Sequence, residues 1–133
     1  MIKLSVTIIT LNEERNLDRC ILSVKQVADE ILVIGSLSTD QTVAIAERHG
    51  ARVILQPFLG HLEQKNFATE KATHDWVLAI DADEELSPEL IKSVLQVKKA
   101  PACKAYHYNR LNNYWGHWIR HGAWYPDRKI RLY

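Results

Sequence analysis

Residues 76–85 read WVLAIDADEE and decide the fold class of this chain. The apolar run is short enough for a buried strand, and it ends abruptly at Asp81 and Asp83. Open α/β sheets place their ligand crevice at the carboxyl ends of their strands. Because like charges repel, two converging carboxylates favour a site for a hard cation, Mg²⁺ or Mn²⁺, that also bridges substrate phosphates. The alternative for this pattern alone is a strand followed by a polar turn.

The bulk composition indicates a globular protein of one domain or part of one. Its 133 residues are 47% hydrophobic and 25% charged, which is ordinary for a soluble domain. Cys20 and Cys103 lack metal or redox spacing, and this favours a reducing cytoplasm. Cys20 falls on an apolar helical stripe and is expected in the core. No apolar run approaches the length of a membrane span.

Strand and helix patterns alternate along the first 100 residues. Strands are expected at 4–10, 30–34, 51–55 and 75–80, and helices at 13–26, 38–48, 62–72 and 87–100. This alternation predicts an α/β fold with a mostly parallel sheet, right-handed crossovers and helices on both faces.

The chain changes character near residue 103. Residues 104–133 carry a net charge of +5 and three of the four tryptophans, whereas residues 1–103 carry −4. A strand is expected at 104–114, a long loop at 112–126 and the start of another strand at 127–133. We therefore expect an α/β core at 1–103 and an incomplete aromatic, basic segment at 104–133.

Three further polar segments follow predicted strands or begin helices. Residues 10–14 (TLNEE) and 35–42 (GSLSTDQT) either contact a ligand or cap the next helix. Residues 64–66 (QKN) either meet a diphosphate or form a solvated helix face. The chain has no Gly-x-Gly-x-x-Gly after a strand and no Gly-Lys-Ser/Thr loop, which argues against an NAD-type Rossmann domain and a P-loop NTPase.

Taken in order, these segments resemble a known family. TLNEE at 10–14, STDQT at 38–42, QKNFA at 64–68 and DADE at 81–84 resemble the nucleotide-sugar-binding half of family-2 glycosyltransferases with a GT-A fold. Residues 124–132 (WYPDRKIRL) are similar to bacterial lipopolysaccharide-core β-1,4-glucosyltransferases. The resemblance implies a GT-A, Rossmann-like sheet, truncated at the C-terminus because complete catalytic domains of this type are much longer.

The resemblance also implies roles for individual residues. Asp83 would coordinate a divalent cation, Mg²⁺ or Mn²⁺, that bridges the diphosphate, and Asp81 would contact the metal through water or the ribose. The implied nucleotide-binding residues besides Asp81 are Thr10, Asn12, Glu13, Lys65 and Asn66.

The implied reaction is inverting transfer of a sugar from a nucleoside-diphosphate sugar, with UDP as the expected nucleotide. A carboxylate deprotonates the acceptor hydroxyl, which attacks the anomeric carbon as the diphosphate leaves. The base is expected beyond Tyr133. Asp127 is the alternative, since it is the only acid after Glu89.

The chain departs from the family pattern at several positions. The family has an acid where this chain has Gly35, and glycines where it has Leu37 and Gln41. A turn that needs positive φ would be strained at Leu37 or Gln41. The Gly-Phe-Gly that precedes Gln-Lys-Asn in the family is altered here to residues 60–62 (GHL).

The expected partners follow from the resemblance and from the basic, aromatic tail. They are a nucleotide sugar and an envelope glycan or lipid-linked sugar acceptor, with peripheral contact at the inner face of the cytoplasmic membrane and no nucleic acid. One alternative is a non-catalytic relic that self-associates through an exposed sheet edge. Another is a glycan-binding module that depends on Trp118 and Trp124.

Overall fold

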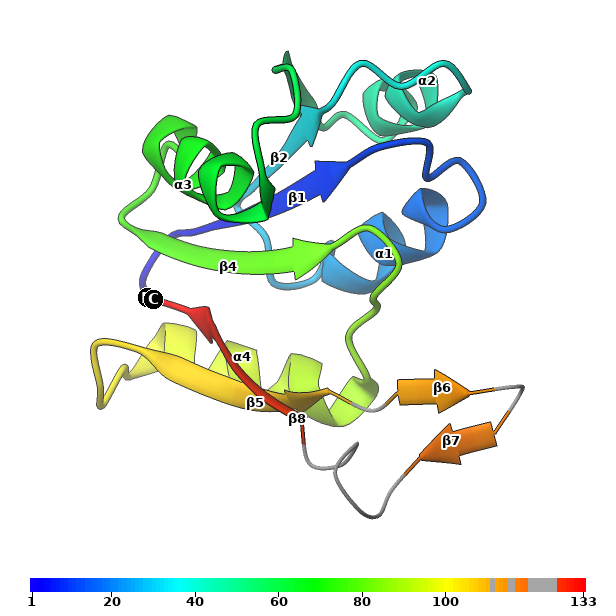
Figure 1. Cartoon of the computed structure of the whole chain (residues 1–133). Helices are drawn as coiled ribbons and strands as arrows, with labels where there is room; N and C mark the ends of the chain where they lie inside the picture. The colour runs from blue at the N-terminus through cyan, green and yellow to red at the C-terminus, as the bar shows by residue number, and fades with distance from the viewer. Residues whose placement is uncertain (111, 115–116, 120–126) are drawn as a thin grey trace.

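Four parallel strands form most of a six-stranded sheet in the computed structural model (Figure 1). The strand order is β3-β2-β1-β4-β8-β5, and the last two strands are antiparallel to their neighbours. The bounds are Leu4–Thr10 for β1, Glu30–Gly35 for β2, Arg52–Leu55 for β3, Trp76–Asp81 for β4, Tyr106–Arg110 for β5 and Asp127–Leu132 for β8. The structure describes residues 1–110, 112–114, 117–119 and 127–133.

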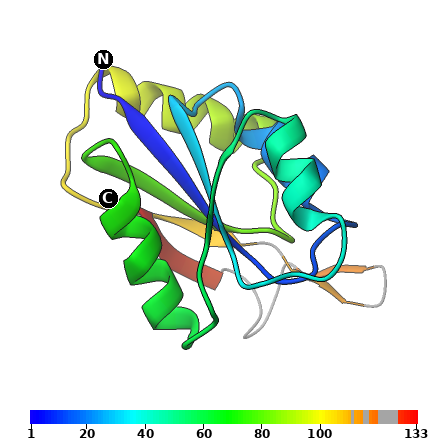
Figure 2. The same ribbon diagram turned by 90° about the horizontal axis from the view of Figure 1, so that it is seen from above.

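Four helices cover the two faces of this sheet (Figure 2). They are α1 (Leu17–Val24), α2 (Thr42–Arg48), α3 (His61–Lys71) and α4 (Pro88–Lys99). Side chains alternate along each strand, so Val33 of β2 belongs to the core cluster that includes residues of α1, α2 and α4, whereas Leu32 and Ile34 belong to a second cluster with Ala68 of α3. The prediction of a mostly parallel sheet with helices on both faces is confirmed. In the part of the chain that the structure describes, no helix is long and apolar enough to cross a bilayer.

Two helices begin later than the sequence pattern predicts. The first was expected from residue 13, but Glu13 only closes a turn, with its carbonyl accepting from the Asn16 and Leu17 amides before α1 begins. The second was expected after a cap at 38–40, but α2 starts at Thr42 behind Gln41, which makes no side-chain cap. The polar residues of the loops at 10–14 and 38–42 hydrogen-bond to each other instead.

The prediction of one strand over 104–114 and a loop over 112–126 is wrong in two respects. β5 ends at Arg110, and residues 112–114 form a separate strand, β6. This strand pairs with β7 (His117–Ile119) in a two-stranded sheet of its own, because its partner is the next strand rather than β8. The predicted last strand at 127–133 is confirmed as β8.

The end of the chain is part of the main sheet. Leu132 of β8 is buried in the same core as Leu78 of β4, and the two residues are register partners. Val77 and Tyr133 exchange two backbone hydrogen bonds at 2.6 and 2.9 Å. Strand β8 therefore closes the core beside β4, although it lies beyond the domain boundary expected at residue 103.

Leu37 adopts the strained backbone that the sequence indicated. Its φ is +61°, whereas Gln41, the other position with a missing glycine, has a φ of −84°. A left-handed leucine costs roughly 1–2 kcal/mol, and its 56% exposure means that little burial offsets this cost.

Leu37→Gly is expected to raise the free energy of unfolding by about 0.5–1 kcal/mol, because relief of the strain exceeds the added entropy of the unfolded chain. Urea denaturation measures this change. Gln41→Gly is the matched control and should give no gain, since its φ is already favourable. An equal gain in both variants would mean that backbone strain is not the cause.

Candidate functional site

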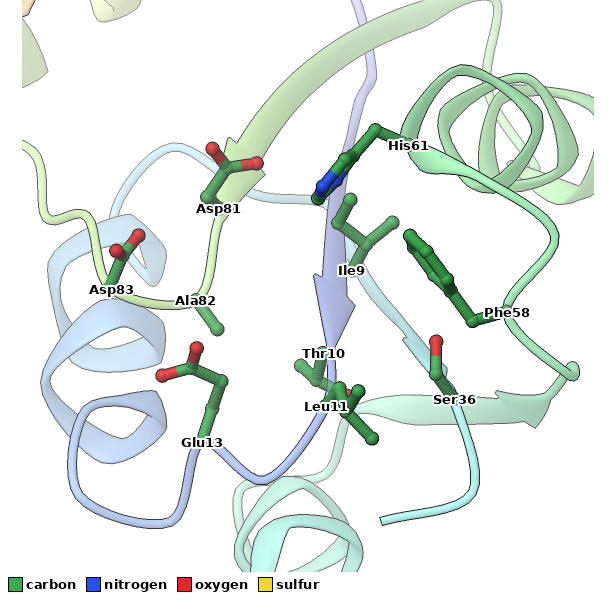
Figure 3. Close-up of a pocket in the computed structure, with 10 residues that line it drawn as sticks. All are labelled: Ile9, Thr10, Leu11, Glu13, Ser36, Phe58, His61, Asp81, Ala82 and Asp83. Carbon is green, nitrogen blue, oxygen red and sulfur yellow. The ribbon is translucent and has the colours of Figure 1, made fainter.

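A cavity of about 370 Å³ opens at the carboxyl ends of β1, β2 and β4 (Figure 3). This is the edge of a parallel sheet where ligands bind in open α/β folds. The volume falls within the range of small-molecule sites. The lining residues are Ile9, Thr10, Leu11, Glu13, Ser36, Phe58, His61, Asp81, Ala82 and Asp83.

The turn after β4 is fixed by hydrogen bonds on both sides of the Asp-x-Asp pair. The Asp81 amide donates to a Glu84 carboxylate oxygen at 2.8 Å, and the Glu84 amide donates to the Asp81 carbonyl at 3.0 Å. Ala82 is buried, whereas Asp83 is exposed at the cavity. The turn thus holds both aspartates at one end of the strand, as the sequence predicted (Figure 3).

Cys20 supports this turn from α1. Its thiol lies 3.6 Å from the Asp81 carbonyl, within hydrogen-bond reach of sulfur. Burial raises the pKa of Cys20 to about 12, and the nearby carboxylates of Glu84, Asp83 and Asp81 add to the effect. The thiol is therefore an inert core group, as expected from its place on the apolar helical stripe.

Lys65 approaches the same strand end from α3. Its ammonium lies 3.9 Å from an Asp81 carboxylate oxygen. The sequence resemblance implied that Lys65 lies near a nucleotide, and this contact brings Lys65 to the strand end that carries Asp81. Neither Lys65 nor Asn66 is among the cavity-lining residues, and Asn66 is exposed one position further along the helix, about 100° away.

The loop at 10–14 is held by the loop at 38–42. The Asn12 amide donates to the Ser38 hydroxyl and the Asn12 side chain accepts from the Thr39 amide, both at 2.9 Å. The Glu13 amide donates to the Thr42 hydroxyl, also at 2.9 Å. Polar side chains of each loop therefore accept hydrogen bonds from backbone amides of the other, which neither the ligand reading nor the helix-cap reading of the sequence anticipated.

This arrangement determines which loop residues reach the cavity. Asn12 has a φ of +51° and does not line the cavity, whereas Thr10 and Glu13 do. The Thr10 hydroxyl donates to the Ile34 carbonyl at 3.3 Å, so its hydrogen is already used. Hydrogen bonds from the Thr42 hydroxyl and amide lower the pKa of Asp40, which keeps this carboxylate of the loop at 38–42 ionised.

Among the cavity residues that sequence reasoning did not name as site residues are one polar side chain and two aromatic ones, Ser36, Phe58 and His61. Ser36 was read only as part of the segment at 35–42, which was expected either to contact a ligand or to cap a helix, and Phe58 and His61 were given no role. Phe58 and His61 make an edge-on ring contact with centroids 5.2 Å apart on the side of the cavity opposite Asp83 (Figure 3). Their position beyond the end of β3 is the only sequence signal that could have placed them there.

The donor set suits a divalent cation shared with a substrate. Asp81, Asp83 and Glu13 supply carboxylate oxygens at one cavity. Mg²⁺ and Mn²⁺ are held at such sites by one or two carboxylates together with substrate phosphates and water. In the described ranges, no three His, Cys, Asp or Glu side chains gather closely enough to hold a metal ion by themselves. The residues present therefore fit a cation that a phosphate ligand helps to bind.

The tail residues named from the sequence cannot be placed in the site. The side chains of Asp127 and Trp118, and all of Trp124, lie outside the described residues. The backbone of Asp127 begins β8 and pairs with Arg110 of β5. The candidate base and the aromatic acceptor surface therefore stay predictions.

A family model described as glycosyl transferase family 2 matches residues 5–132. The chain belongs to this family. An uncharacterised glycosyltransferase of Rickettsia conorii is 56% identical over 88 residues, which cover 66% of this chain and 31% of that relative. The lipopolysaccharide core biosynthesis glycosyltransferase LpsC of Rhizobium meliloti is 40% identical over 100 residues, covering 66% of this chain and 37% of the relative.

Two solved structures share the fold. S. aureus TarS superposes with a TM-score of 0.65 over 88% of this chain and 38% of that chain, at 21% identity. Glucosyl-3-phosphoglycerate synthase from Mycobacterium tuberculosis, in complex with Mn²⁺, UDP and phosphoglyceric acid, gives a TM-score of 0.56 and 28% identity. That match covers 63% of this chain and 35% of the synthase. The predicted GT-A fold is confirmed, and this family-2 chain spans about a third of the length of the Rickettsia relative.

Proposed function

We propose that this chain forms the donor-binding part of a metal-dependent glycosyltransferase that uses a UDP-sugar. The observation that carries the proposal is that Asp81, Asp83 and Glu13 line one cavity, with Lys65 at 3.9 Å from Asp81. Carboxylates can hold a cation that binds a diphosphate, and an adjacent ammonium group can bind the diphosphate directly.

Asp83 and Asp81 would hold the divalent cation, Mg²⁺ or Mn²⁺. When bound, the cation supplies neutralisation of the negative charge that develops on the leaving diphosphate. Lys65 is placed to contribute a second positive charge, once the diphosphate competes for its contact with Asp81. Thr10 and Glu13 would shape the nucleotide side of the cavity, and Asn12 would act through the loop that it holds. The exposed Asn66 is the least favoured of the proposed nucleotide contacts.

The proposed reaction inverts the anomeric carbon. The acceptor oxygen forms the new bond to this carbon while the bond to the diphosphate oxygen breaks, and the hydroxyl proton passes to a carboxylate base. The base is proposed beyond Tyr133, with Asp127 as the alternative. An envelope glycan such as a lipopolysaccharide core is the proposed acceptor, supported by the similarity to LpsC. The proposed location is the inner face of the cytoplasmic membrane.

A non-catalytic relic is the second candidate. The observation in its favour is the strained Leu37, with a φ of +61°, in the segment between β2 and α2. Such a chain would keep the fold and lose nucleotide affinity.

Isothermal titration of UDP into the chain, with Mn²⁺ and then with EDTA, separates these functions. We expect binding in Mn²⁺ that weakens at least about tenfold in EDTA, because the cation neutralises the repulsion between the carboxylates and the diphosphate. Equal affinity in the two conditions would contradict metal-assisted donor binding. No binding in either condition would favour the relic.

A further inference from the structure

Ser36 is a buried hydroxyl at the cavity, and α3 holds it in place. It follows the last residue of β2 and is only 8% exposed, yet it lines the cavity. The side-chain amide nitrogen of Gln64 lies 3.0 Å from the Ser36 hydroxyl oxygen. In Figure 3 the Ser36 hydroxyl points toward the space between Leu11 and Phe58.

The orientation of the Gln64 amide is fixed by a second contact. The same nitrogen lies 3.4 Å from the backbone carbonyl of Gln56. A carbonyl oxygen only accepts hydrogen bonds, so the NH₂ group and not the amide oxygen must face it. If the amide were flipped, the Gln64 amide oxygen would face the Gln56 carbonyl oxygen, and two acceptors would repel each other.

This orientation determines what Ser36 can do. The Gln64 NH₂ group only donates, so the Ser36 oxygen must accept from it. The Ser36 hydroxyl hydrogen is left over, and no described residue accepts it in a hydrogen bond that the structure records. Since Ser36 lines the cavity, this hydrogen is available to an acceptor on a bound ligand.

Gln64 has a cost in folding stability. It is 1% exposed, and its amide oxygen is buried without a partner among the described residues. A well-packed apolar side chain would avoid that desolvation penalty. Exceptions of this kind concentrate at functional sites. The unpaired amide oxygen of Gln64 therefore supports a functional role for this residue, which is to orient Ser36.

We propose that Ser36 is a hydrogen-bond donor that reads a carbonyl oxygen on the nucleobase, and that Gln64 is the residue that positions it. This inference rests on the proposed function, since it assigns the base end of the same nucleotide site. Adenine carries no carbonyl oxygen, whereas uracil does. Ser36 therefore favours UDP over ADP. Gly35 has no side chain that could contact the base, so the selection between UDP and ADP is assigned to the adjacent Ser36.

The test is titration of UDP and ADP, each in Mn²⁺, into the unmodified chain and into S36A, Q64M and the double variant. S36A is expected to lose about tenfold in UDP affinity, the value of one hydrogen bond in a desolvated site, and little in ADP affinity. Q64M should lose UDP affinity without losing thermal stability, because an unpaired buried oxygen leaves with the amide. Ser93→Ala, on the exposed face of α4, is the matched control and should change neither affinity.

The double variant distinguishes positioning from general damage. If Gln64 acts through Ser36, Q64M adds no further loss of UDP affinity once Ser36 is alanine. Independent, additive losses would overturn the positioning role. Unchanged UDP affinity in S36A, with normal binding by the unmodified chain, would overturn the inference while the proposed function stands. Failure of the unmodified chain to bind UDP at all would overturn both.

Discussion

Replacing Asp83 with asparagine is expected to remove the metal-dependent part of UDP binding. Asp83 lines the cavity but is exposed, so its change should leave the core intact. An amide keeps the shape and one oxygen but loses the charge that a hard cation requires. Because a bound cation neutralises the repulsion between the carboxylates and a charged ligand, we expect UDP affinity in Mn²⁺ to fall at least about tenfold, to the level seen in EDTA.

Glu85→Gln provides the matched control for Asp83→Asn. Glu85 lies two residues further along the same turn, is exposed, and pairs with Arg19 at 3.8 Å rather than lining the cavity. The same loss of one charge there should change UDP affinity less than about twofold, because exposed charges are screened. A loss in both variants would point to the overall field of the acidic turn rather than to a metal ligand at Asp83.

The sequence could predict the part of the site that depends on local pattern. Asp81 and Asp83 follow a buried strand, and the reciprocal bonds between Asp81 and Glu84 arise within the turn itself. Such short-range features are fixed by residues that are neighbours in the sequence. The ordered strands and helices follow in the same way from apolar periodicity, which is why the parallel sheet was predictable.

The sequence could not predict how polar loop residues choose their partners. Asn12 and the loop at 38–42 carry groups that suit either a ligand or each other, and the choice depends on the distance between β1 and β2 in the folded sheet. Their mutual bonds span 26 and 27 residues. Tertiary proximity of this kind leaves no periodic signal, so the hydrogen bond between the Asn12 side chain and the Thr39 amide could not be predicted.

The course of the chain between β3 and α3 could not be predicted from the sequence either. Phe58 and His61 reach the cavity because the chain turns at Gly60, where φ is +139°. A glycine permits this backbone but does not require it. The antiparallel insertion of β8 beside β4 had the same difficulty, since it pairs residues more than 50 positions apart and its strand pattern does not reveal a partner.

Replacing Glu30 with glutamine is expected to lower the free energy of unfolding by about 3 kcal/mol at neutral pH. Glu30 begins β2 at the amino edge of the sheet, and its side chain is 14% exposed. Burial alone would raise its pKa, but hydrogen bonds from the Thr73 hydroxyl and amide, the Ser5 hydroxyl and the Arg52 guanidinium lower it to about 2. A depression of that size corresponds to about 3 kcal/mol in favour of the ionised folded state.

The pH dependence of stability tests the electrostatic origin of this effect. The pKa of Glu30 is lower in the folded than in the unfolded chain, so its contribution is fully present above the ordinary glutamate pKa. It is lost as the pH falls from about 5 toward 2. Urea denaturation across this range should therefore show the unmodified chain and Glu30→Gln converging at low pH. Glu47→Gln, at an exposed position on α2, should track the unmodified chain throughout. A difference between the unmodified chain and Glu30→Gln that stays constant with pH would mean that Glu30 acts through packing and neutral hydrogen bonds, and not through its charge.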